Sequence, residues 1–110
     1  MAVSPSLELR MDRLRDLNTK ISNIYNEMVA NSRSYMDEIF KFNATMSVSV
    51  KREAVSVARK CFESNERLKI EMEKAQKEAR ALSDSVAKLV IEEQKDFIDQ
   101  LFNCDVTGGR

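Results

Sequence analysis

Histidine and tryptophan are absent from this chain of 110 residues, and glycine and proline are nearly so. The one proline and two glycines lie near the ends, as Pro5, Gly108 and Gly109. Tight turns between strands call for residues that reach positive φ or have φ preset, and residues 6–107 contain neither glycine nor proline. These absences exclude β-rich folds and predict an all-α protein.

The missing residue types also exclude most chemistry. Without histidine there is no imidazole base and no Glu-x-x-His motif of the kind that holds two metal ions in helical bundles. Cys61 and Cys104 are too few and too far apart for a zinc site or a disulfide framework, and no glycine-rich phosphate loop is present. We therefore expect no enzyme activity, no small-molecule substrate and no catalytic, cofactor-binding or metal-binding residues.

Neither sign of charge dominates, because 18 basic residues balance 18 acidic ones. The chain as a whole has no field that would attract nucleic acid or an anionic membrane, and its lysines and arginines are interleaved with glutamates. No run of eighteen apolar residues exists, and the first residues lack the apolar core of a signal peptide. We expect a cytoplasmic protein that neither inserts into membranes nor binds nucleic acid.

Residues 58–101 carry the strongest pattern that is present. Their apolar residues recur at alternating intervals of three and four, which predicts a long amphipathic helix with a coiled-coil-like seam. At 1.5 Å per residue this stretch would be roughly 65 Å long, so it needs a partner helix. The seam and its extension supply most of the predicted interface: Leu68, Met72, Ala75, Ala79, Leu82, Val86, Val90, Phe97 and Leu101.

A second periodic stripe begins at Leu7 and continues to Met46, which predicts another helix. The polar stretch 31–34 is a candidate kink within it. The stripe widens after Tyr35, and it adds Ile39, Phe42 and Met46 to the predicted interface. Apolar residues on several faces between Tyr35 and Phe62 indicate more than one neighbour for this region.

The turn between the helices is predicted at about residues 45–50, where serine, threonine and valine form helix poorly and Thr45, Ser47 or Ser49 could cap a second helix. A turn at 63–65, or one uninterrupted rod, is the alternative. The predicted organisation is a disordered segment 1–6, one helical domain 7–103 (helices at about 7–44 and 51–103) and a flexible tail 104–110. The predicted fold is a long antiparallel αα-hairpin that assembles into a homodimer or higher bundle, with a three-helix bundle as the alternative.

Asn65 is the one polar residue among the regular seam positions 58–89. A single polar residue on such a seam can set the register and the oligomeric state, which is the role we predict here. The competing interpretation places Asn65 at a helix end or turn.

Charge is distributed unevenly along the second helix. Residues 51–80 hold nine basic and six acidic residues, whereas residues 84–105 hold two basic and six acidic ones. This order opposes the helix dipole, which favours acidic residues first and basic residues last. A second copy of the same helix, running antiparallel, would match basic to acidic halves.

The first helix is too short to cover the second. A turn near residue 47 brings the first helix back to about residue 87, which leaves roughly four turns of the second helix uncovered. Together these features predict a helical scaffold, adaptor or complex subunit whose partners are further copies of itself or another helical protein. The alternatives are an amphipathic protein that coats lipid or a hydrophobic granule, and a nucleic-acid-associated coiled coil.

Overall fold

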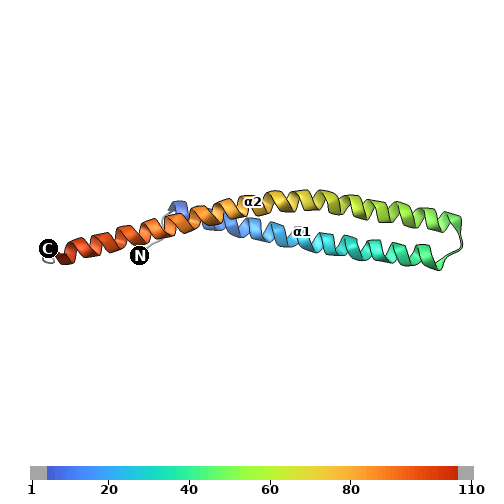
Figure 1. The fold of residues 1–110 in the computed structure, drawn as a ribbon, viewed down its shortest axis with the longest axis horizontal. Helices are drawn as coiled ribbons and strands as arrows, with labels where there is room; N and C mark the ends of the chain where they lie inside the picture. The colour runs from blue at the N-terminus through green and yellow to red at the C-terminus, as the bar shows by residue number, and fades with distance from the viewer. Residues whose placement is uncertain (1–4, 107–110) are drawn as a thin grey trace.

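Two long helices form an antiparallel hairpin in the computed structural model, which describes the backbone of residues 5–106 and the side chains of residues 5–103 (Figure 1). Helix α1 spans Pro5–Ala44 and helix α2 spans Val48–Val106. The molecule measures 90 × 17 × 16 Å. The predicted all-α hairpin is confirmed.

A three-residue connection reverses the chain, and Ser47 closes the first turn of α2. The backbone N–H of Val50 donates to Ser47 Oγ at 3.3 Å, and the N–H of Ser47 itself donates to Thr45 Oγ1 at 3.1 Å. A serine in this position satisfies a backbone donor that the helix cannot pair internally. The second helix consequently begins at Val48, earlier than the expected residue 51.

The other predicted boundaries differ from the structure at both ends. Pro5 and Ser6 belong to α1, because proline fits the first turn of a helix, where its missing N–H has no intrahelical partner. Residues 1–4, also expected to be disordered, lie outside the described part. The helix likewise continues to Val106 through the start of the expected tail, and residues 107–110 lie outside the described part. Helix α2 passes through residues 63–65, so the competing turn there and the uninterrupted rod are both wrong.

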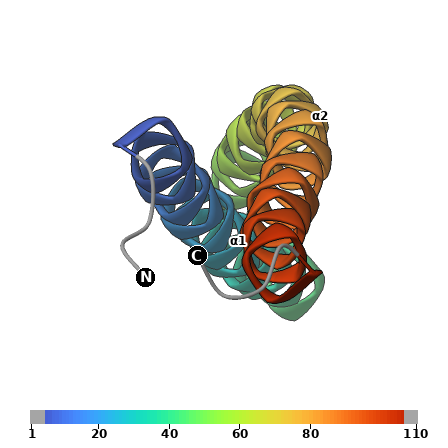
Figure 2. The ribbon, with the colours of Figure 1, turned by 90° about the vertical axis from the view of Figure 1, so that its left-hand side faces the viewer.

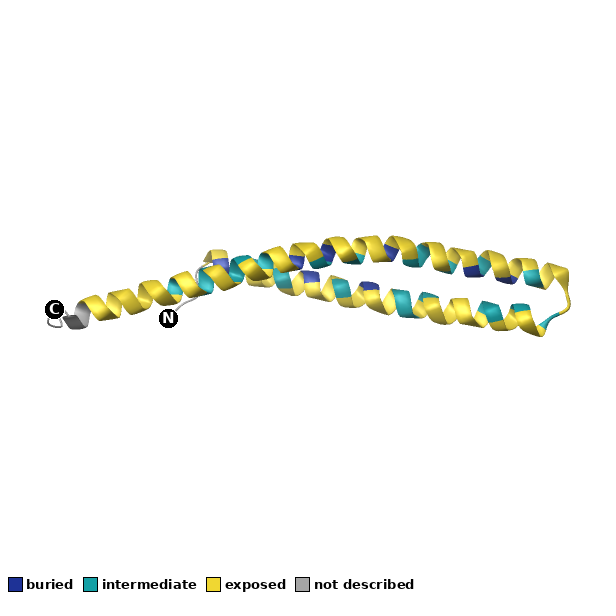
Figure 3. Cartoon of the chain, viewed as in Figure 1, coloured by how far each residue is buried: buried dark blue, intermediate teal, exposed yellow. Residues whose placement is uncertain are grey.

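The core is a single seam between the two helices. Leu17, with 2% of its surface exposed, lies in one cluster with Ala75 and Ala79, and the half-buried side chains of Leu14, Ile21 and Leu82 pack against this cluster. Figure 3 shows buried and half-buried residues on the facing sides of the two helices and exposed residues on their outer sides. Small alanines opposite a large leucine let the helix backbones approach closely, and this seam fixes the pairing of α1 with α2.

Contacts between the helices define their antiparallel register. Arg13 lies beside Glu78, Asn31 beside Asn65, and Phe42 beside Lys51. In this register Pro5, the first residue of α1, lies beside about residue 88 of α2, because both helices advance by ~1.5 Å per residue. Figure 2, viewed along the long axis, shows the two helices crossing at an angle, with the C-terminal part of α2 projecting beyond α1.

The part of α2 beyond this register, residues 90–106, is called the overhang below. Every residue from 94 to 103 is exposed. Its exposed apolar side chains include Phe97 at 42%, Ile98 at 62%, Leu101 at 50% and Phe102 at 64%. Aliphatic and aromatic side chains in such a number are unusual on a surface that stays in water, so the overhang is a candidate contact segment.

Candidate functional site

The residues predicted as an interface fall into three structural groups. Leu68, Ala75 and Ala79 are buried, and Met72, Leu82, Val86 and Val90 are half-buried. In the middle of the seam, α1 of the same chain occupies the place of a partner. Ile39 and Phe42 are half-buried near the turn, whereas Met46 in the connection is 95% exposed and Phe97 and Leu101 project from the overhang.

Asn65 faces α1 and takes part in a small polar cluster on the seam. Asn31 Nδ2 donates to Asn65 Oδ1 at 3.1 Å and to Ser64 Oγ at 3.0 Å. Asn65 Nδ2 donates in turn to Ser32 Oγ at 3.3 Å. The polar stretch 31–34 lies within an unbroken α1, and its side chains meet those of residues 64–65. An amide pair in an otherwise apolar seam favours the one register in which both amides are satisfied.

The two flanks of the seam differ in chemistry. One flank is called the polar side. On each helix it carries the residue directly before every second seam residue, such as Arg13 before Leu14 and Glu78 before Ala79. Arg13 Nη2 lies 2.9 Å from Glu78 Oε1 on this flank, and both side chains are about half exposed. An exposed pair of this kind contributes little to stability. The other residues of this flank are mostly polar or charged as well: Lys20, Glu27, Ser34, Ser64 and Glu71.

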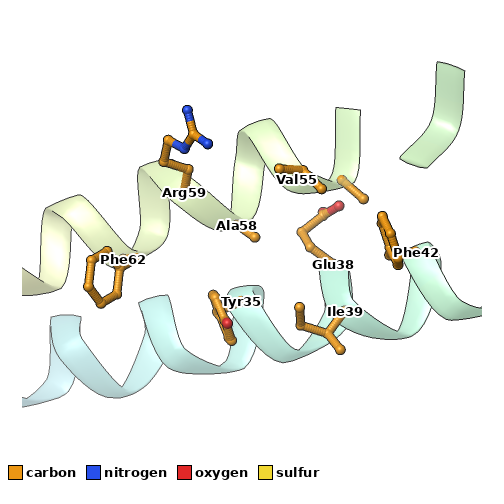
Figure 4. Close-up of a pocket in the computed structure, with 9 residues that line it drawn as sticks. Tyr35, Glu38, Ile39, Phe42, Val55, Ala58, Arg59 and Phe62 are labelled. Carbon is orange, nitrogen blue, oxygen red and sulfur yellow. The ribbon is translucent and has the colours of Figure 1, made fainter. Parts of the chain in front are cut away.

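The opposite flank, called the apolar side, contains a groove between the helices. One hollow of about 290 Å³ near the turn is lined by α1 and α2 together (Figure 4). Tyr35 and Ile39 extend from α1 toward α2, and Phe62 extends from α2 toward α1, while Arg59 points away from α1 at the rim. The remaining lining residues are Glu38, Phe42, Ala54, Val55 and Ala58.

Three further hollows continue this groove away from the turn, because neighbouring hollows share lining residues. Tyr35 and Phe62 also line a hollow with Met36, and Met36 lines the next with Met28. Met28 and Phe62 together line the one that holds Ile70. The apolar groove is defined here by its large apolar members: Tyr25, Met28, Val29, Tyr35, Met36, Ile39, Phe42, Val55, Phe62, Ile70 and Met72. Polar and charged residues line the further hollows as well: Ser32, Arg33, Asp37, Asn65, Glu66, Lys69 and Glu73.

Two lysines make charged and polar contacts near the connection between α1 and α2. Lys51 Nζ donates to the carbonyl oxygen of Phe42 at 2.9 Å and lies 4.1 Å from the centre of the Phe42 ring. It therefore satisfies a carbonyl at the C-terminus of α1 and stabilises the ring by a cation–π contact. Lys41 Nζ lies 3.0 Å from Glu38 Oε1, and this hydrogen bond and the carboxylate charge raise the pKa of Lys41. Lys51 therefore links the end of α1 to the start of α2, and Lys41 neutralises the carboxylate of Glu38, which lines the groove.

The lining of the groove suits contact with apolar side chains. Within residues 5–103, no group of three or more histidine, cysteine, aspartate or glutamate side chains is placed to hold a metal ion. Cys61 is a free, half-buried thiol on the seam, and the side chain of Cys104 lies outside the described part. Met, Tyr and Phe side chains around an elongated hollow are typical of surfaces that receive another helix.

Two features of the site were not predicted from the sequence. The first is the pairing of Asn31 with Asn65. The sequence did indicate it, because the midpoint of these two residues, residue 48, lies beside the expected turn, so an antiparallel hairpin brings them together. The second is the extension of the groove to Tyr25 and Met28. The extension becomes visible only once the helices are paired. In the hairpin, residues that come directly after a seam residue, such as Tyr25 on α1 and Phe62 on α2, lie on the same flank.

No protein-family model, curated protein or solved structure matches this chain. Over the described residues, neither α1 nor α2 contains an apolar stretch of the length that spans a bilayer.

Proposed function

We propose that this protein is a non-enzymatic helical scaffold or adaptor that binds an amphipathic α-helix in the apolar groove. The observation that carries the proposal is the difference between the two flanks of the hairpin. Large apolar side chains from both helices line one flank, and ion-paired or polar side chains cover the other. A partner helix laid along the groove would remove this surface from water, which is the main source of affinity in helix-in-groove recognition.

The exposure of the groove side chains supports this interpretation. Met36 is 51% exposed and Phe62 is 56% exposed, although each lies beside the half-buried seam. Such side chains are enriched at protein interfaces and carry a large share of the binding energy there. The groove is also lined by side chains of adaptable shape, since two of its members are methionines with several rotatable bonds (Met28 and Met36).

We also propose that the protein acts in the cytoplasm. Cys61 carries a free thiol within the seam. A reducing compartment keeps such a thiol from forming bonds between chains.

A photo-crosslinking experiment tests the proposed function. A benzoylphenylalanine is placed at Met36 in the groove, and in a second variant at Lys20 on the polar side. Both proteins are produced in the cells from which the sequence derives and irradiated there. We expect the Met36 variant to form adducts with a discrete protein whose crosslinked peptide is an amphipathic helix, and the Lys20 variant to form no such adduct.

Circular dichroism of the purified full chain provides the second arm. A scaffold is fully helical in lipid-free buffer, and its helicity does not change when anionic vesicles are added. Helicity that arises only with vesicles, or adducts formed equally from both positions, would show that the groove is not a protein-binding site.

A further inference from the structure

We propose that the groove is occupied by the overhang of a second copy of this chain, so that two hairpins pair antiparallel and each overhang fills the groove of the other. The proposal rests on the proposed function, because it names the helix that the groove receives. It makes the interface isologous: the same two surfaces meet twice around a two-fold axis.

The lengths of the two surfaces match. Along α2 the groove extends from Val55 to Met72, or about 26 Å at the α-helical rise. The overhang, residues 90–106, is about 25 Å long by the same rise. An antiparallel copy whose overhang lies on the turn end of this groove presents the turn end of its own groove to the first overhang, so most of both apolar surfaces is removed from water.

The overhang turns its apolar residues toward the correct flank. Val90 and Phe97 continue the seven-residue series that contains Val55 and Phe62 of the groove. This spacing keeps all four residues on the same flank of a supercoiled helix. Leu101, which is four residues after Phe97, widens the same stripe. Two copies placed with their apolar sides together therefore bring each overhang stripe onto the other groove.

Charge selects the groove over the rival arrangement in which two overhangs pair with each other. Residues 89–103 contain four acidic residues and one lysine, whereas residues 51–60 beside the groove contain four basic residues and one glutamate. Two overhangs would bring like charges together, which disfavours their pairing. An overhang beside the turn end of a second copy brings Glu93 near Arg59, a residue on the rim of the groove.

The middle of the helices is compatible with the same register. Centring Phe97 on Ala58 of the second copy places the two-fold axis near residue 78 of α2, as an isologous pairing requires. Glu73 then lies within about two residues of the position opposite Arg80 of the second copy, and Glu66 within about one residue of the position opposite Lys88. Both glutamates line or flank the hollow that holds Ile70, so these pairs lie along the apolar side rather than on the polar side.

The decisive experiment places a benzoylphenylalanine at Phe97 in the purified full chain. After irradiation and trypsin digestion, we expect adducts with the groove peptides 34–41, 53–59 and 61–67, in a product of twice the chain mass. Within one chain, Phe97 is about 52 Å from Phe62 along a continuous helix, so such adducts arise only between copies. Adducts with the overhang peptide 96–110, or a protein that stays monomeric at every concentration tested, would overturn the proposal.

Sedimentation equilibrium of substituted chains measures the same contact without a crosslinker. Phe97→Glu should raise the dimer dissociation constant by at least about tenfold, because it places a carboxylate in an apolar groove. Leu9→Glu is the matched control: Leu9 is 72% exposed on α1, away from both surfaces, and its substitution should leave the constant unchanged. Equal effects of the two substitutions would contradict the assignment.

A charge exchange tests the direction of the pairing. Arg59→Glu and Glu93→Lys should each weaken the dimer, and the double variant should recover most of the loss, since it restores opposite charges in the antiparallel arrangement. Failure of the double variant to recover rules out this register. If Met36 captures a different helical protein in cells while the purified chain stays monomeric, the second copy is excluded as the occupant and the scaffold function stands.

Discussion

At the scale of single residues, Leu17 and the two alanines opposite it hold the seam closed. Leu17 has the largest fully buried side chain of the described residues, and Ala75 and Ala79 are 3% and 9% exposed. A leucine between two alanines fills the space that their small side chains leave. The packing of the two helices therefore depends on the side-chain volumes at these three positions.

Leu17→Ala should lower the free energy of unfolding by about 3 kcal/mol, because it removes buried methyl groups and leaves a cavity between helices that cannot collapse fully. Urea unfolding followed by circular dichroism measures the change. Leu9→Ala, at a 72% exposed position on the same helix, is the control and should change stability only slightly. Similar losses for both variants would show that α1 is not anchored at Leu17.

The amide pair on the seam should behave as a coupled unit. Asn31→Leu alone leaves the half-buried amide of Asn65 without its main partner and should cost about 1 kcal/mol, and the reciprocal substitution should cost a similar amount. Replacing both asparagines should cost less than the sum, since no unsatisfied amide remains. A double-mutant cycle by urea unfolding, at one fixed protein concentration, measures the coupling. Strict additivity would mean that the hydrogen bond does not couple the two residues.

At the scale of secondary-structure elements, the connection at residues 45–47 determines where both helices end. Ser47 closes the first turn of α2 and Lys51 satisfies a carbonyl near the end of α1. Helix ends leave backbone groups unpaired. Ser47 accepts a hydrogen bond from an N–H at the start of α2, and Lys51 donates one to a carbonyl at the end of α1, on either side of the three-residue connection. The short connection is therefore stabilised without glycine.

Ser47→Ala should destabilise the hairpin by about 1 kcal/mol through loss of the hydroxyl acceptor for the Val50 N–H. Thermal unfolding by circular dichroism checks this. Ser47→Asp should retain most of the stability, because a carboxylate accepts the same hydrogen bond and suits the N-terminus of the helix dipole. An aspartate as damaging as the alanine would show that the serine acts in another way.

Deuterium exchange of the backbone amides in the overhang should reveal whether the dimer forms. In a monomer, the amides of residues 94–102 belong to an exposed helix end that projects beyond α1, so they should exchange with deuterium rapidly. In the proposed dimer their exchange should slow as the protein concentration rises, while exchange at residues 75–82 is slow at every concentration. Exchange that is equally fast at all concentrations would contradict the docked overhang.

At the scale of the whole molecule, the hairpin is too thin to bury much of its own surface. It is 90 Å long but only 17 × 16 Å across, and its buried residues form a single line between two helices. We expect a chain of this shape to gain further stability from association, since an apolar flank that it leaves open can be covered by another molecule.

The thermal midpoint of the full chain should therefore rise with protein concentration, as mass action requires when folding is coupled to dimer formation. Differential scanning calorimetry over a range of dilutions measures this shift. The Phe97→Glu chain should show a lower midpoint that varies little with concentration. A wild-type midpoint independent of concentration would indicate that the hairpin folds and functions alone.

The sequence alone determined the helical class, the two stripes and the seam, because the spacing of apolar residues and the absence of glycine and proline are local properties. Positions 58, 61, 65, 68, 72, 75, 79, 82, 86 and 89, predicted from intervals of three and four, are all buried or half-buried. The uncovered end of α2 also followed from the sequence, since helix lengths and the position of the turn fix how far α1 reaches.

Only the tertiary structure decided which polar residues meet and which flank is open. Asn31 and Asn65 are separated by more than thirty residues, and their pairing depends on the register of two helices to within a fraction of a turn. The apolar groove combines side chains of α1 and α2, and a stripe on either helix alone does not reveal on which flank the two coincide. Periodicity specifies the faces of each helix, but the packing of one helix on the other specifies which faces remain for a partner.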